Sequence, residues 1–148
     1  MSKRCILFLV LSVVPAISLA GSEMHFRAMH GYGGEICSVR VDQGGAVRSK
    51  FANQFRRTKE NDAHSADAAL ARRIVATARA LTQFNQACSG GDGRNIDLYL
   101  TVTSGDHVEK ELYCKGASDW PGSSDAAQLV DLLKQVLPES YRQACFSY

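Results

Sequence analysis

Residues 96–102 read IDLYLTV, and they form the clearest half-buried strand in the sequence. The four apolar side chains would lie on one side of an extended chain, and the polar ones between them on the other. A polar turn at residues 104–106 follows, and residues 107–114 lead back as a second strand. The inward-facing positions of this return strand are expected to be Val108, Leu112 and Cys114. Lys110 interrupts that inner face, which indicates an edge strand or an open end of the sheet.

The preceding part of the chain is expected to contribute further antiparallel strands. The expected strands are residues 24–32, residues 36–42 and a returning segment at residues 46–51. Glycine pairs at Gly33-Gly34 and Gly44-Gly45 provide the turns between them, since glycine adopts positive φ at little cost. Residues 53–64 are polar and show no periodicity, so they predict a loop.

Two amphipathic helices are expected. Ser65 can cap a helix over residues 66–87, in which apolar side chains recur at helical spacing. Asp125 can cap the second helix, and Pro138 would end it. The buried stripe of the second helix is expected to be Leu129, Leu132, Leu133, Val136 and Leu137. The order of elements predicts an α+β fold: an antiparallel sheet of four to five strands with two helices packed on one face.

The first twenty residues resemble an export signal rather than part of the fold. Lys3 and Arg4 precede an apolar run at residues 6–16, and Ser18 and Ala20 stand at the −3 and −1 positions of a cleavage site. Removing this segment from a chain with 17 basic and 15 acidic residues leaves 15 of each. The sequence therefore predicts one domain over residues 21–148, periplasmic or secreted, with no membrane insertion after cleavage. A net charge of zero argues against a nucleic-acid partner.

Four cysteines remain in this mature chain. An even number in an exported protein predicts two disulfides, since no Cys-x-x-Cys pair provides a metal or redox motif. The hairpin geometry favours Cys88–Cys114 together with Cys37–Cys145. The main rival pairs Cys37 with Cys114 and Cys88 with Cys145.

No established catalytic or cofactor motif is present. The glycines around Tyr32 lack the lysine of a phosphate-binding loop, and the histidines lack the spacing of metal ligands, so neither a cofactor nor a metal is expected. Glu109 and Glu111 lie two residues apart on a strand, which is typical of a solvated face. His107 with Asp106 or Glu109 is the one group that could serve a small hydrolase.

The order of segments resembles a known family. A strand at residues 25–30 runs into Gly33-Gly34, an alternating strand with Val39-Arg40-Val41-Asp42 follows, and a helix, a hairpin and a closing helix complete the chain. This order resembles the emfourin group of small bacterial metallopeptidase inhibitors, whose Gly-Gly-aromatic-Ala-Gly segment is matched at Gly33-Gly34. The resemblance implies a cystatin-like fold and inhibition of a peptidase.

The sequence favours a non-enzymatic protein that occludes a partner protein, as a peptidase inhibitor or as an immunity protein against a toxin. Loops on a rigid scaffold are suited to such recognition. The expected contact residues are Gly31, Tyr32, Gly33, Gly34, Gly105, Asp106, His107 and Trp120. The alternative is a small envelope hydrolase or ligand-binding protein that uses His107 and neighbouring carboxylates. A structural subunit of an envelope assembly is a third possibility.

Overall fold

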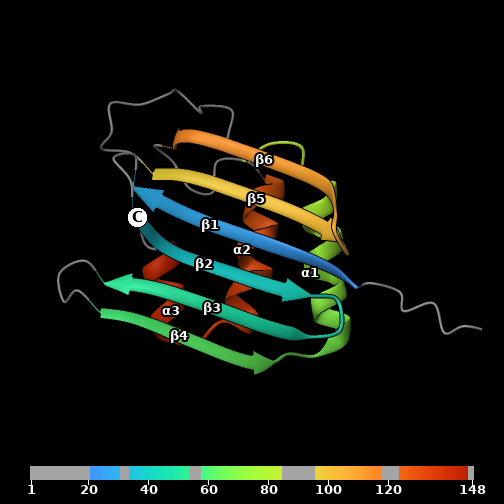
Figure 1. The fold of residues 1–148 in the computed structure, drawn as a ribbon, viewed down its shortest axis with the longest axis horizontal. Helices are drawn as coiled ribbons and strands as arrows, with labels where there is room; N and C mark the ends of the chain where they lie inside the picture. Colours follow the sequence, from blue (N-terminus) through green and yellow to red (C-terminus); the bar gives the residue numbers. More distant parts are fainter. Residues whose placement is uncertain (1–20, 31–33, 54–57, 85–95, 118–123, 147–148) are drawn as a thin grey trace, which may run out of the picture.

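A computed structural model of the chain describes residues 21–30, 34–53, 58–84, 96–117 and 124–146. These residues form one antiparallel sheet in the order β4-β3-β2-β1-β5-β6 (Figure 1). The strands are β1 (Ser22–His30), β2 (Glu35–Asp42), β3 (Ala46–Asn53), β4 (Thr58–Ser65), β5 (Ile96–Ser104) and β6 (His107–Ala117). The sheet thus has six strands, where the sequence predicted four to five.

Figure 1 shows three helices on the same side of this sheet. They are α1 (Ala68–Ala80), α2 (Ser124–Val136) and α3 (Glu139–Phe146). The predicted α+β class, with its antiparallel sheet and helices on one face, is confirmed. The prediction of two helices was wrong, because the chain turns at Pro138 and continues helically. The Pro138 carbonyl accepts hydrogen bonds from the amides of Tyr141 and Arg142 in the first turn of α3.

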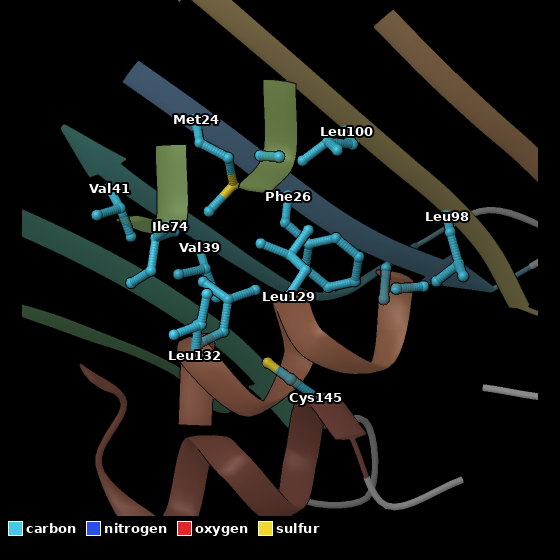
Figure 2. Packing of buried hydrophobic residues seen from close by; sticks show 14 of the residues in the cluster. Met24, Phe26, Val39, Val41, Ile74, Leu98, Leu100, Leu129, Leu132 and Cys145 are labelled. Carbon is cyan, nitrogen blue, oxygen red and sulfur yellow. The ribbon is translucent and has the colours of Figure 1, made fainter. Parts of the chain in front are cut away.

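The core lies between the sheet and the helices (Figure 2). Alternate residues of the central strands point into it, among them Met24 and Phe26 of β1 and Val39 of β2, each with no exposed surface. The predicted stripe of α2 is buried as expected. Burying large apolar side chains is worth roughly 1.5–3 kcal/mol each, so this single layer carries most of the stability of the fold.

Helix α1 is shorter than the predicted helix over residues 66–87. Its N-cap is Asp67, whose Oδ1 accepts from the amide of Leu70 at 2.9 Å, and not Ser65. Its C-cap is Leu81, where the backbone turns to an extended conformation and the carbonyl accepts from Lys110 Nζ at 2.6 Å. The local cap at Asp67 therefore marks the start of the helix, and a tertiary contact from β6 marks its end.

Gly45 fixes the approach of the β2–β3 turn to the start of α1. Its φ is +107°, and a Cβ at this position would lie 2.6 Å from the carbonyl oxygen of Ala66. That close approach allows the carbonyl of Gly45 to accept from the amide of Ala66 at 2.8 Å. The turn therefore requires a residue without a side chain.

Strand β6 lies at the edge of the sheet, as Lys110 indicated. Val108 is 52% exposed, so the prediction that it faces inward was wrong. The pairing of β5 with β6 shifts register between Val102 and Thr103, which pair with Lys110 and Val108. Such a shift turns the following side chains to the other face, and Lys110 reaches α1 in place of Val108.

One disulfide joins described residues. Cys37 of β2 bonds to Cys145 of α3, with Cα atoms 5.6 Å apart, which confirms the pairing that the sequence favoured and contradicts its rival. Cys114 is also disulfide-bonded, whereas Cys88, its predicted partner, falls in residues 85–95, outside the described part. The structure therefore shows one of the two predicted bridges, and Cys88–Cys114 stays a prediction.

Removing this bridge is expected to destabilise the protein strongly. The variant Cys37→Ala/Cys145→Ala should lose about 2–5 kcal/mol of unfolding free energy, since the bridge closes a loop with a sequence separation of 108 residues. Urea denaturation without reductant measures the loss. Ser140→Ala, at an exposed position of α3, serves as the control, and an unchanged midpoint in the double variant would contradict the prediction.

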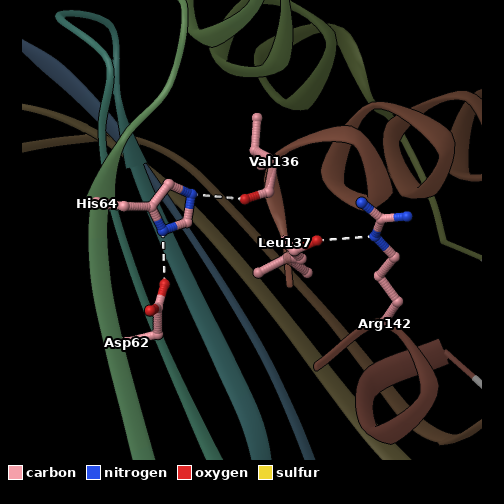
Figure 3. Close-up of polar contacts among 5 residues, drawn as sticks. All are labelled: Asp62, His64, Val136, Leu137 and Arg142. Carbon is pink, nitrogen blue, oxygen red and sulfur yellow. Dashed lines mark hydrogen bonds and ion pairs between the residues drawn. The ribbon is translucent and has the colours of Figure 1, made fainter. Parts of the chain in front are cut away.

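Most of the segment predicted as a loop, residues 53–64, belongs to strand β4, so that prediction was wrong. From Asn61 to Ser65 its side chains alternate between exposed and half-buried positions, but the half-buried ones, Asp62 and His64, are polar, so no hydrophobic period is visible. His64 Nδ1 lies 2.5 Å from Asp62 Oδ2, and His64 Nε2 donates to the Val136 carbonyl at 2.7 Å (Figure 3). Arg142 Nε donates to the next carbonyl, that of Leu137, at 2.7 Å. These side chains satisfy carbonyls at the end of α2, and His64 ties the edge strand to that helix.

Replacing His64 is expected to loosen this edge of the sheet. His64→Ala leaves the Val136 carbonyl without its donor and should lower the free energy of unfolding by about 1–2 kcal/mol. Asn61→Ala, at an exposed position on the same strand, should change it by less than about 0.5 kcal/mol. Equal urea midpoints for the two variants would show that the His64 contact contributes nothing.

Candidate functional site

Four of the eight predicted contact residues are described, and they lie in two separate places. Gly31, Tyr32, Gly33 and Trp120 lie outside the described residues. Gly34 directly precedes β2, and Gly105, Asp106 and His107 lie at the β5–β6 turn. The register of β1 against β5 pairs His30 with Ile96 and Ser22 with Ser104, which puts Gly34 and the β5–β6 turn at opposite ends of the sheet. The length of a nine-residue strand separates them, about 30 Å, so they cannot enter the same narrow cleft side by side.

The residues of the alternative hydrolase are also described. His107 and Asp106 are exposed at the tip of the β5–β6 hairpin. Glu109 turns away from them, because its Oε2 accepts from Arg79 Nε of α1 at 2.7 Å. Among the described residues, Glu109 is therefore bonded to Arg79 and not to His107.

The face of the sheet opposite the helices carries a different group of side chains. On β3, β2 and β1, residues directly opposite one another form two neighbouring rows. The first row reads Arg48, Arg40 and His25, and the second reads Lys50, Ser38 and Arg27. Neighbours within a row have Cβ atoms about 5 Å apart, and the rows are about 7 Å apart along the strands. Register therefore gathers four permanent cations on three adjacent strands.

These two rows surround a hollow of about 370 Å³, to which Glu35 also contributes. We call this hollow the basic pocket. Its cations are incompletely neutralised: Arg40 Nη1 lies 3.5 Å from Glu23 Oε1, and neither Arg48 nor Lys50 has a carboxylate partner among the described residues. Four cations line the pocket against one carboxylate, Glu35, so the lining carries an excess of positive charge at neutral pH. Like charges directly opposite one another in a sheet are destabilising.

His25 lies directly opposite Arg40 at the β1 end of the first row. Burial, followed by the charges of Arg40, Arg27 and Lys50, lowers the pKa of His25 from 6.5 to about 4. The imidazole is therefore neutral at pH 7 and offers one donor and one acceptor nitrogen.

An aromatic pair lies beside the basic pocket. Tyr99 of β5 stacks on Tyr113 of β6 with ring centroids 4.6 Å apart, and the Arg27 guanidinium lies 5.0 Å from the Tyr99 centroid. Tyr113 is 50% exposed. A hydrogen bond with Tyr99, together with burial and the Asp97 carboxylate, raises the pKa of Tyr113 to about 12. Its hydroxyl thus stays a hydrogen-bond donor at physiological pH.

Sequence reasoning missed these residues as a site. A signal was present, since each cation alternates with apolar or small neighbours on its strand, as in Val39-Arg40-Val41. Alternation places each cation on the outer face of its own strand. Alternation within one strand does not show which residue of the neighbouring strand lies opposite each cation.

Comparison with known proteins does not assign this chain to a family. No protein-family model matches the chain, and no curated protein is significantly similar to it. The resemblance to the emfourin group therefore stays a prediction. Among the described residues, no three potential metal ligands cluster together, and none of the described helices is long and apolar enough to cross a membrane.

The lowered pKa of His25 predicts a pH dependence of stability. Between pH 6.5 and about 4, the unfolded chain binds a proton at His25 that the folded chain does not bind. Stability should therefore fall as the pH is lowered through this window, and His25→Asn should remove part of the fall. Urea midpoints at about pH 7 and about pH 4.5 measure it. His107→Asn is the exposed control, and equal pH dependence in wild type and His25→Asn would contradict the prediction.

Proposed function

We propose that this chain is an exported, non-enzymatic protein that binds and occludes an acidic surface of a partner protein through the open face of its sheet. The partner would be a peptidase or a toxin, so the chain would act as an inhibitor or as an immunity protein. The observation that carries the proposal is the gathering of four cations and two stacked tyrosines on that one face.

The chemistry of the face supports recognition of a protein. Arginine and tyrosine are enriched in protein interfaces and among their hot-spot residues. The excess of cations is local, since residues 21–148 contain equal numbers of basic and acidic residues. A partner with an acidic surface would relieve the repulsion within the rows. The attraction between opposite charges would also raise the association rate of the complex.

The scaffold also suits binding. The cations project from paired strands rather than from loops, and a rigid surface loses little conformational freedom when it docks. The Cys37–Cys145 bridge restrains the middle strand of the three that carry the cations. A structural disulfide is typical of oxidising compartments, in agreement with the proposed export.

Charge reversal on the open face tests the proposal. Wild type and Arg48→Glu/Lys50→Glu, each immobilised, are used to capture proteins from the exported fraction of the producing cells. A specific partner should bind the wild type, and the reversal should weaken its binding by about tenfold or more. Higher salt should weaken the wild-type complex as well.

Arg72→Glu/Arg73→Glu is the matched control, because it makes the same charge change at exposed positions of α1, on the other side of the sheet. This control should retain the partner. Loss of the partner in both variants, or retention in both, would show that the open face is not the binding surface. Failure of the wild type to capture any specific protein would refute the proposed function as a whole.

A further inference from the structure

We propose that the basic pocket is a binding site for a small phosphate monoester. This inference goes beyond a docking surface for a protein, because it assigns a small ligand to one hollow within the open face. It does not depend on the identity of a protein partner, and small-molecule binding tests it separately.

The charge of the site favours a doubly charged anion. Four cations, Arg27, Arg40, Arg48 and Lys50, line the pocket with one carboxylate, Glu35, and Arg40 alone is paired with a further carboxylate, Glu23. A phosphate monoester carries about −1.5 to −2 at pH 7, so it offsets more of this positive charge than a carboxylate or a sulfate ester, each of which carries one negative charge. The match is therefore with a phosphate group.

The donor set fits the same group. Three of the four cations are arginines, whose planar forks bind phosphate oxygens through paired hydrogen bonds. They approach from different strands: Arg27 from β1, Arg40 from β2 and Arg48 from β3. Neutral His25 lies at the β1 end of the first row, next to Arg40, and can donate one further hydrogen bond without adding charge.

The size of the site indicates that the phosphate is attached to a larger molecule. A hollow of about 370 Å³ is at the lower end of the range for small-molecule pockets, about 300–1,000 Å³. Arg27, on the side toward β5, lies over the ring of Tyr99, which stacks on Tyr113. The Tyr99 ring is thus covered by Arg27 on the side of the pocket and by Tyr113 on the other side, so the room for the attached group comes from the volume of the hollow itself.

Calorimetry with glucose 6-phosphate, inorganic phosphate and glucose tests the proposal. Glucose 6-phosphate should bind saturably, inorganic phosphate should bind more weakly, and glucose should not bind. Arg48→Thr/Lys50→Thr removes two cations from exposed positions of β3 and should weaken glucose 6-phosphate binding by about tenfold or more. The control Arg72→Thr/Arg73→Thr should bind like wild type.

The titration of His25 provides a second readout that a purely structural role of these arginines would not change. The titration is followed through the ring proton resonances of His25. The pKa of His25 should rise by about one unit or more when glucose 6-phosphate is bound, because an anion next to the ring favours the imidazolium. The single variant Arg48→Thr, which changes only one exposed side chain, should show a smaller rise.

Each other outcome overturns the proposal. Absence of saturable binding would refute the site, and equal binding of inorganic phosphate would show that the ester part is not recognised. Equal affinity in wild type and in folded Arg48→Thr/Lys50→Thr, with folding checked by circular dichroism, would place the ligand elsewhere. None of these results bears on capture of a protein partner, so the proposed function can fail or stand independently.

Discussion

Strand β1 is the element on which the rest of the structure depends, because it pairs with β2 on one side and with β5 on the other. It joins the N-terminal strands to the C-terminal hairpin. Its even-numbered residues from Met24 to Ala28 are buried under the helices. A slip of one residue would expose all of them, so burial fixes the register of β1. The same constraint sends His25 and Arg27 to the open face.

The parts of the fold that the sequence predicted are those in which a local pattern coincides with burial. Alternation in residues 96–102 predicted β5, and the stripe from Leu129 to Leu137 predicted the buried face of α2. The bridge Cys37–Cys145 followed from the hairpin arrangement. Strand β4 was missed because Asp62 and His64 occupy its half-buried positions. Their hydrogen bonds replace apolar contact there, and hydrogen bonds leave no period in the sequence.

The basic pocket could not be predicted in the same way, since it depends on contacts between strands. Each strand shows its own outward cations, but Arg40 meets Arg48 only because the short β2–β3 turn sets that register. Gly45 secures this turn by docking it against Ala66. The predicted contact residues, by contrast, were chosen from turns. Turns are visible locally, and pairing then put Gly34 and the β5–β6 turn at opposite ends of the sheet.

Stability and recognition are thus divided between the two faces, and β2 connects them. On its inner face Cys37 is bonded to α3, and on its outer face the adjacent Ser38 lies in the basic pocket. Repulsion between Arg40 and Arg48 would tend to separate β2 from β3. The disulfide and the buried valines of β2 oppose that separation from the other side. The apolar face therefore holds like charges close together on the polar face, in the arrangement that an anion would bind.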